Sequence, residues 1–153
     1  MDDWWRMYDE TKQFLTELLE SIPPAHDRLI EMLEALKLVG ENTPQTDPSD
    51  WDGELPKDDF LTLYTKLGAK FPEYGYYPDT APGDPNADKS SLGDAIDDLC
   101  DIARDLAEAI WLYENVSEAE AKWHFKFSYE IHWGEHLAKL LLYLKAGAPR
   151  LHI

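Results

Sequence analysis

Apolar residues recur every three or four positions along most of this chain, which is the spacing that places them on one face of an α-helix. The segments with this spacing lie at about 2–20, 24–39, 57–70, 92–114 and 118–145. No segment shows the convincing alternation of apolar and polar residues that is typical of a half-buried strand. The pattern predicts an all-α protein, a single-domain bundle of about five helices across residues 1–153.

Serine and glycine residues mark several of the predicted helix ends. Ser117 with Glu120, and Ser91 with Asp94, have the form of a capping box, in which a serine side chain binds a free amide of the first turn. These pairs predict the starts of the last two helices. Gly40 predicts the end of the second helix, because glycine readily adopts the left-handed conformation that terminates many helices.

Two long connections separate the helices, at about 40–56 and 71–91. The first is rich in proline, aspartate and threonine and has no apolar period. The second begins with "FPEYGYYP", whose aromatic residues we expect to cap one end of the core: Phe71, Tyr74, Tyr76 and Tyr77. Loops of this length inside a compact domain are uncommon and are often functional.

The chain is strongly acidic, with 31 Asp and Glu against 14 Lys and Arg and a net charge of −17. Such a charge repels phosphate backbones, so we expect no nucleic-acid partner, whereas a basic protein or a cation is attracted. A single cysteine, Cys100, excludes an internal disulfide and is typical of a reducing cytosol. The N-terminus lacks the pattern of a signal peptide, and no apolar run approaches the roughly 20 residues of a membrane span. We therefore expect a cytoplasmic protein that does not bind a membrane.

An acidic stripe lies on the helix predicted at 92–114. At about 100° per residue, its aspartates fall within a sector of roughly 100°: Asp94, Asp97, Asp98, Asp101 and Asp105. Apolar residues occupy the opposite side, so one interpretation is a solvated face. Like charges three or four residues apart nevertheless cost about 0.2–0.5 kcal/mol per pair. The stripe is therefore either a solvated face or a surface for a basic partner or a cation.

A second stripe, of aromatic residues and histidines, lies on the last helix. The sequence "HWGEH" places His132 and His136 one turn apart, and Tyr129 falls on the same side. A broad apolar face that includes Trp123 and Trp133 covers the other side of this helix. A helix with this pattern is either central in the fold or lines a pocket or an interface.

The five residues of "HWGEH", at 132–136, match the H-x-x-E-H pattern of the inverted zinc proteases. Those enzymes need an acidic ligand further along the chain, and no carboxylate side chain follows His136. A different metal site would combine His132 and His136 with Asp98 and Asp101. Because the link at 115–117 is short, the two helices are expected to be antiparallel neighbours with their apolar faces inward. The two stripes would then point away from each other, so the sequence predicts hydrogen-bonded histidines and no metal or other cofactor.

The segments "GDAIDDLCDIARDL" (93–106) and "WHFKFSYEIHWGEHL" (123–137) resemble a family of uncharacterised bacterial proteins, classed as a domain of unknown function. Members of that family also have a segment similar to "FPEYGYYP". The resemblance covers roughly residues 60–145. It implies an all-helical cytoplasmic protein and supplies no reaction, cofactor or catalytic residue.

Two classes of function fit these patterns. The first is a non-catalytic interaction protein that docks a basic protein partner, or that forms a homodimer through its aromatic and histidine stripe. The alternative is a metal- or small-ligand-binding enzyme that uses the aspartates of 94–105 with the histidine pair. The candidate binding surface in both cases consists of Asp94, Asp97, Asp98, Asp101, Asp105, Tyr129, His132 and His136.

Overall fold

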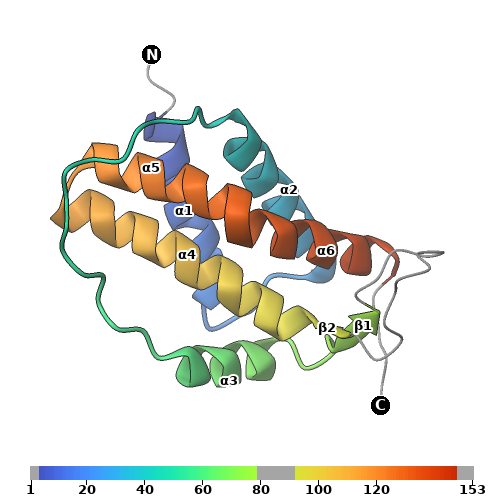
Figure 1. Ribbon diagram of the computed structural model, residues 1–153. Coiled ribbons are helices and arrows are strands. Elements are labelled where there is room, and N and C mark those ends of the chain that lie inside the picture. The colour runs from blue at the N-terminus through green and yellow to red at the C-terminus, as the bar shows by residue number, and fades with distance from the viewer. Residues whose placement is uncertain (1–3, 79–91, 148–153) are drawn as a thin grey trace.

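The computed structural model describes residues 4–78 and 92–147, and these residues fold into helices with one very short sheet (Figure 1). The helices are α1 (Trp4–Leu19), α2 (His26–Asn42), α3 (Phe60–Lys70), α4 (Ala95–Asn115), α5 (Glu118–Ser128) and α6 (Gly134–Lys145). A π-helical turn, η1 (Tyr129–Trp133), joins α5 to α6, so that the three elements form one interrupted helix. The predicted all-α class with about five helices is confirmed.

The start of α4 differs from the sequence prediction. Ser91 lies outside the described residues, and Asp94 is the N-terminal cap, because its side chain accepts hydrogen bonds from the amides of Ile96 and Asp97. The three residues before the helix form β2 (Leu92–Asp94), which pairs antiparallel with β1 (Tyr76–Pro78). The expected helix start at 92 was therefore wrong, since this backbone is extended and hydrogen-bonds to β1. The Ser117 cap of α5 is observed, with Ser117 accepting from the amide of Glu120.

Helix α4 lies at the centre of the fold. Figure 1 shows α4 (yellow) crossing the molecule between α3 and the long helix formed by α5, η1 and α6. It packs against five other elements, namely α1, α3, α5, η1 and α6. Its buried residues are Ala95, Ile96, Asp98, Leu99, Cys100, Ile102, Ala103, Leu106, Ala109 and Leu112. The acidic stripe is therefore only partly a solvated face, because Asp98 belongs to the interior.

The π-helical turn changes which side of the last helix is buried. Along α5 the buried residues include Phe125 and Ser128, and the next buried residue, Trp133, comes five positions later instead of three or four. The backbone amide of Gly134 donates to the carbonyl of Tyr129, which is the five-residue spacing of a π-helix. Ile131, which the constant helical period places on the apolar face, is 63% exposed.

Tyr129 packs at the point where the last helix crosses α2. A Cβ atom on Gly40 or Gly134 would lie 2.8 Å from its ring, so both glycines allow the close approach of the two helices. Helix α2 continues to Asn42, so Gly40 serves this close approach and does not end the helix as the sequence predicted. The first long connection consequently lies at 43–59 and not at 40–56.

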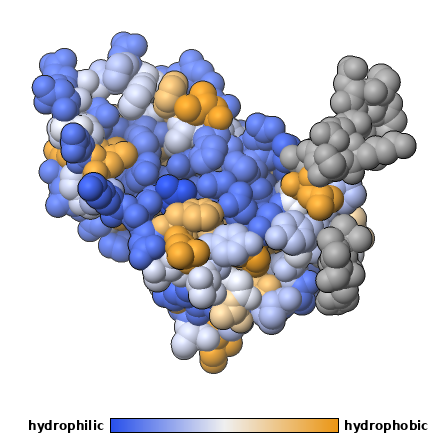
Figure 2. All heavy atoms as spheres, turned by 60° about the horizontal axis from the view of Figure 1, so that its bottom comes forward, coloured by the Kyte–Doolittle hydropathy of each residue, from blue (hydrophilic) through white to orange (hydrophobic). Residues whose placement is uncertain are grey.

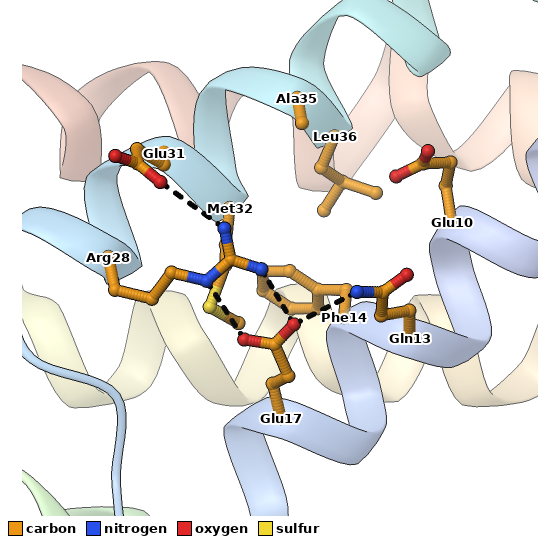
Figure 3. Close-up of a pocket in the computed structure, with 9 residues that line it drawn as sticks. All are labelled: Glu10, Gln13, Phe14, Glu17, Arg28, Glu31, Met32, Ala35 and Leu36. Atoms are coloured by element: carbon orange, nitrogen blue, oxygen red, sulfur yellow. Dashed lines mark hydrogen bonds and ion pairs between the residues drawn. The ribbon is translucent and has the colours of Figure 1, made fainter.

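Side-chain contacts hold that connection and helix α1 in place. Glu120 of α5 is buried and accepts hydrogen bonds from the amide and hydroxyl of Ser49 in the connection. In Figure 3, Arg28 of α2 reaches across to Glu17 of α1, with its guanidinium nitrogens 2.7 and 3.0 Å from the two carboxylate oxygens. None of the described helices combines the length and the apolar content needed to cross a membrane.

The tight contact at Gly134 generates a stability prediction with an internal control. Gly134→Ala is expected to lower the free energy of unfolding by about 1–3 kcal/mol, because the new methyl group collides with the Tyr129 ring and carbonyl. Gly68→Ala on α3 meets no atom within 4 Å. It is expected to raise stability by up to about 1 kcal/mol through helix propensity alone. Urea denaturation followed by circular dichroism measures both, and equal effects of the two substitutions would contradict this role of the π-helical turn.

Candidate metal centre

The acidic stripe of α4 and the two histidines of the last helix face each other. Nδ1 of His132 lies 2.6 Å from Oδ2 of Asp105, and Nδ1 of His136 lies 2.7 Å from Oδ1 of Asp98. The prediction that the two stripes point away from each other was therefore wrong. No third helix or second subunit is needed to bring them together.

The π-helical turn accounts for this difference. In an uninterrupted helix, residues 7 and 11 positions after Phe125 lie on the same side as Phe125, and these are His132 and His136. The extra residue in the turn moves Trp133 into the buried line instead. The histidines are thereby displaced to the side of that line, where the aspartates of α4 lie.

Asp101 stands between the two imidazole rings. Its Oδ2 atom lies 3.3 Å from Nε2 of His136 and 4.0 Å from Nε2 of His132. One potential ligand atom from each of the three residues lies within 4.8 Å of the other two. These three residues form the candidate centre, and Asp98, which the sequence also suggested as a ligand, instead contacts His136 through Nδ1.

Each residue of the candidate centre is held by a second polar group. Asp105 holds His132, and Asp98 holds His136. The Nη1 atom of Arg104 lies 3.8 Å from Oδ1 of Asp101, on the side away from the histidines. Metal-binding histidines usually donate their other ring nitrogen to a carboxylate in this way, which fixes the ring orientation and the tautomer.

The hydrogen bonds at Nδ1 determine whether the Nε2 atoms of His132 and His136 carry a hydrogen or a lone pair. An ionised carboxylate only accepts hydrogen bonds, so the Nδ1 atoms of His132 and His136 carry the hydrogen. In neutral rings, both Nε2 atoms then have lone pairs directed at the same small volume as the Asp101 carboxylate. Such an arrangement is complementary to a cation. Without a cation, a protonated His136 ring forms ion pairs with Asp98 and Asp101.

Burial makes negative charge costly in this cluster. Burial is the main cause that raises the pKa of Asp98 above its usual value, and the hydrogen bonds from His136 and Tyr77 partly oppose it. The pKa of Asp105 is also raised, mainly by burial, with His132 opposing. The pKa of His136 is raised chiefly by its hydrogen bond with Asp98. A bound divalent cation would relieve this uncompensated negative charge.

One side of the cluster is open to solvent. The His132 side chain is 42% exposed and that of His136 is 28% exposed, whereas Asp101 and Asp98 are 14% and 6% exposed. The carboxylates therefore form the floor and the rings form the rim. A metal held here would keep coordination positions that a small molecule can reach.

The remaining predicted site residues have other positions. Asp94 caps α4 and accepts a hydrogen bond of 2.5 Å from the hydroxyl of Tyr64. Asp97 is half-buried, and its pKa is raised first by burial and then by the charges of neighbouring aspartates. Tyr129 packs against Gly40 and Trp133, and neither contact connects it to the cluster of aspartates and histidines.

Tyr77 is the contributor that the sequence did not identify. It is buried, stacks on Tyr143 with 5.0 Å between the ring centres, and donates its hydroxyl hydrogen to Oδ2 of Asp98. The "FPEYGYYP" segment suggested only that its aromatic residues cap the core, as buried Phe71 and Tyr74 do. Pairing of β1 with β2 places Tyr77 opposite Gly93, where any Cβ would collide with the tyrosine ring.

Comparison with known proteins agrees with this fold. Residues 6–146 match the family described as Domain of unknown function (DUF5063). The chain belongs to this family. The crystal structure of protein BF1032 from Bacteroides fragilis is similar, with a TM-score of 0.72, 15% identity and 96% of each chain covered, which shows a shared fold. No curated protein matches the chain. The predicted resemblance to a family of unknown function is confirmed.

The raised pKa of His136 predicts how the metal-free DUF5063 protein responds to pH. A folded-state pKa above the unfolded value means that the contribution of His136 to stability is complete below about pH 6.5 and is lost as the pH rises through the folded-state pKa. The charges that face His136 are those of Asp97, Asp98 and Asp101, all on α4.

In EDTA, the difference in free energy of unfolding between wild type and His136→Gln is therefore expected to shrink as the pH rises from about 6 to 9. Urea denaturation at several pH values measures this difference. A difference that stays constant, or that grows with pH, would show that the histidine is not held as an ion-pair partner of Asp98.

Proposed function

We propose that this DUF5063 protein binds one divalent transition-metal ion through Nε2 of His132, Nε2 of His136 and the carboxylate of Asp101. One observation carries the proposal: both Nε2 atoms converge on Asp101, while both Nδ1 atoms are held by other carboxylates. Imidazole nitrogen together with carboxylate oxygen is a ligand set that suits zinc, iron, manganese and nickel.

The spacing of two of the three ligand atoms is already what such an ion requires. Two ligands of a tetrahedral zinc ion lie about 3.3 Å apart, because zinc–nitrogen bonds are about 2.0–2.1 Å long. His136 and Asp101 already have a separation of 3.3 Å, and His132 is at 4.0 Å. The His132 ring, the most exposed of the three side chains, needs to move to complete the set, whereas His136 and Asp101 already have the required separation.

Three protein ligands with one open side are typical of a catalytic metal site, whereas structural zinc sites are usually closed by four protein ligands. A divalent ion in such a site lowers the pKa of a bound water molecule and supplies a nucleophile near neutral pH. The chain's own residues would hold the ion, fix both rings and leave the solvent side free. Metal-assisted hydrolysis of a small, accessible substrate is the reaction class that this arrangement favours.

The contacts of the aspartates favour this function over the docking of a basic protein by the acidic stripe. Asp94 is engaged by the first turn of α4 and by Tyr64, and Asp98 and Asp105 are engaged by the histidines. These carboxylates have fewer free lone pairs to offer a partner. A basic protein partner, a homodimer and a cytoplasmic location remain predictions that rest on the sequence alone.

Thermal unfolding tests the proposed metal centre. After treatment with EDTA, the protein is expected to melt at a higher temperature when Zn²⁺, Mn²⁺ or Ni²⁺ is added. An ion present at 100 times its dissociation constant adds about 2.7 kcal/mol of stability. For a chain of this size that corresponds to a rise of roughly 5–10 °C.

The variants His132→Gln, His136→Gln and Asp101→Asn are expected to lose this rise. His124→Gln is the matched control, because His124 pairs with Glu108 outside the proposed ligand set. Metal analysis after dialysis should find one ion per wild-type chain. An unchanged wild-type melting temperature with every ion, or an equal rise in His132→Gln and His124→Gln, would contradict the proposal.

A further inference from the structure

A second cavity lies on a different side of α4 from the candidate metal centre. It has a volume of about 380 Å³, opens to solvent, and is lined by α1, by the residues that lead into α3, by α3 itself and by α4. Its walls are mainly apolar and include Leu15 and Leu19 of α1, Leu63 of α3, and Ala107 and Trp111 of α4. Sites for small organic ligands have volumes of about 300–1,000 Å³ and walls of this composition.

Three acids and one arginine at the cavity rim already have polar contacts within the protein, and Lys57 also lines the rim. Asp58 accepts two hydrogen bonds from Arg104, at 2.6 and 3.2 Å. Oε2 of Glu108 lies 3.0 Å from Nε2 of His124, and Asp59 accepts from the amide and hydroxyl of Thr62. These pairs leave the rim acids with no strong requirement for a charged ligand. The net charge of −17 also disfavours a free anion.

The distribution of hydrophobic residues on the surface favours a small ligand over a protein partner. On the face shown in Figure 2, hydrophobic residues form separate patches within a largely hydrophilic surface. A protein interface needs a broader contact area, of about 800 Å² per partner. Asp58 and Arg104 both line the cavity, and the Arg104 guanidinium lies 5.1 Å from the centre of the Phe60 ring.

We propose that this cavity is a binding site for an uncharged, apolar small molecule with an aromatic or aliphatic body. The walls supply contact with apolar groups, and the Arg104–Asp58 pair satisfies two of the rim charges without a charged ligand. Trp111, which is half-buried beside Trp51 with 6.3 Å between the ring centres, supplies a flat aromatic surface for such a body. The inference does not depend on a metal ion.

Titration with N-phenyl-1-naphthylamine, an uncharged dye whose fluorescence rises in apolar surroundings, tests the site. The measurement is made in EDTA, so that failure of the metal centre does not affect it. Wild type is expected to give a saturable rise that fits one site per chain. Ala107 lines the cavity and is itself exposed, so Ala107→Phe fills the space without disturbing the core.

Ala107→Phe is expected to weaken binding at least about tenfold, because the new ring occupies the volume of the ligand. Ala138→Phe is the matched control, since Ala138 is exposed on α6 and does not line the cavity. Ala107→Glu provides a second test and is also expected to weaken binding, because an apolar body at the mouth would remove water from the new carboxylate. A wild-type signal that does not saturate, or equal affinity in Ala107→Phe and Ala138→Phe, would overturn the proposal.

Discussion

The need to satisfy buried carboxylates on α4 organises this protein. A carboxylate such as that of Asp98, whose side chain is only 6% exposed, is stable in the interior only when other groups hydrogen-bond to it. His136 from the last helix and Tyr77 from β1 provide those bonds, and His132 does the same for Asp105. The packing of α4, the pairing of β1 with β2 and the rotation of the last helix all meet at this cluster. Hydrogen bonds in a half-buried cluster also fix ring orientations, which surface ion pairs do not do reliably.

The π-helical turn is the device that makes the cluster possible. Helices of this kind are rare, which indicates that they are less stable than α-helix. They occur mostly as single turns inside α-helices, frequently at functional sites. Trp133 offsets part of this lower stability: it is fully buried and its indole nitrogen donates to the hydroxyl of Ser128 at 3.1 Å. Gly134 admits the Tyr129 ring at the same point. The last helix thereby packs its apolar face against the core and still presents two histidines to α4.

Much of the fold could be predicted from the sequence, because amphipathic period and capping residues are local signals. They gave the helical class and the Ser117 cap, and the helical wheel brought together the five aspartates and the two histidines. The convergence of the two groups could not be predicted, since a constant period of 3.6 residues does not anticipate an inserted residue at η1. The strands were missed because three-residue strands have no periodicity to detect. The contact of Tyr77 with Asp98 was missed for the same reason, since Tyr77 lies on β1. Asp94 and Ser91 both have capping side chains, and only the pairing of 92–94 with β1 decides between them.

The central claim is that the two Nε2 atoms and the Asp101 carboxylate hold a metal ion. The most direct test is a crystal structure of protein loaded with Zn²⁺, with anomalous diffraction measured on both sides of the zinc absorption edge. The account predicts one strong anomalous peak at about 2.0–2.2 Å from Nε2 of His132, Nε2 of His136 and an oxygen of Asp101. It also predicts that the contacts of Asp98 and Asp105 with the Nδ1 atoms are kept. Full metal loading of the crystal without a peak at this position would contradict the account.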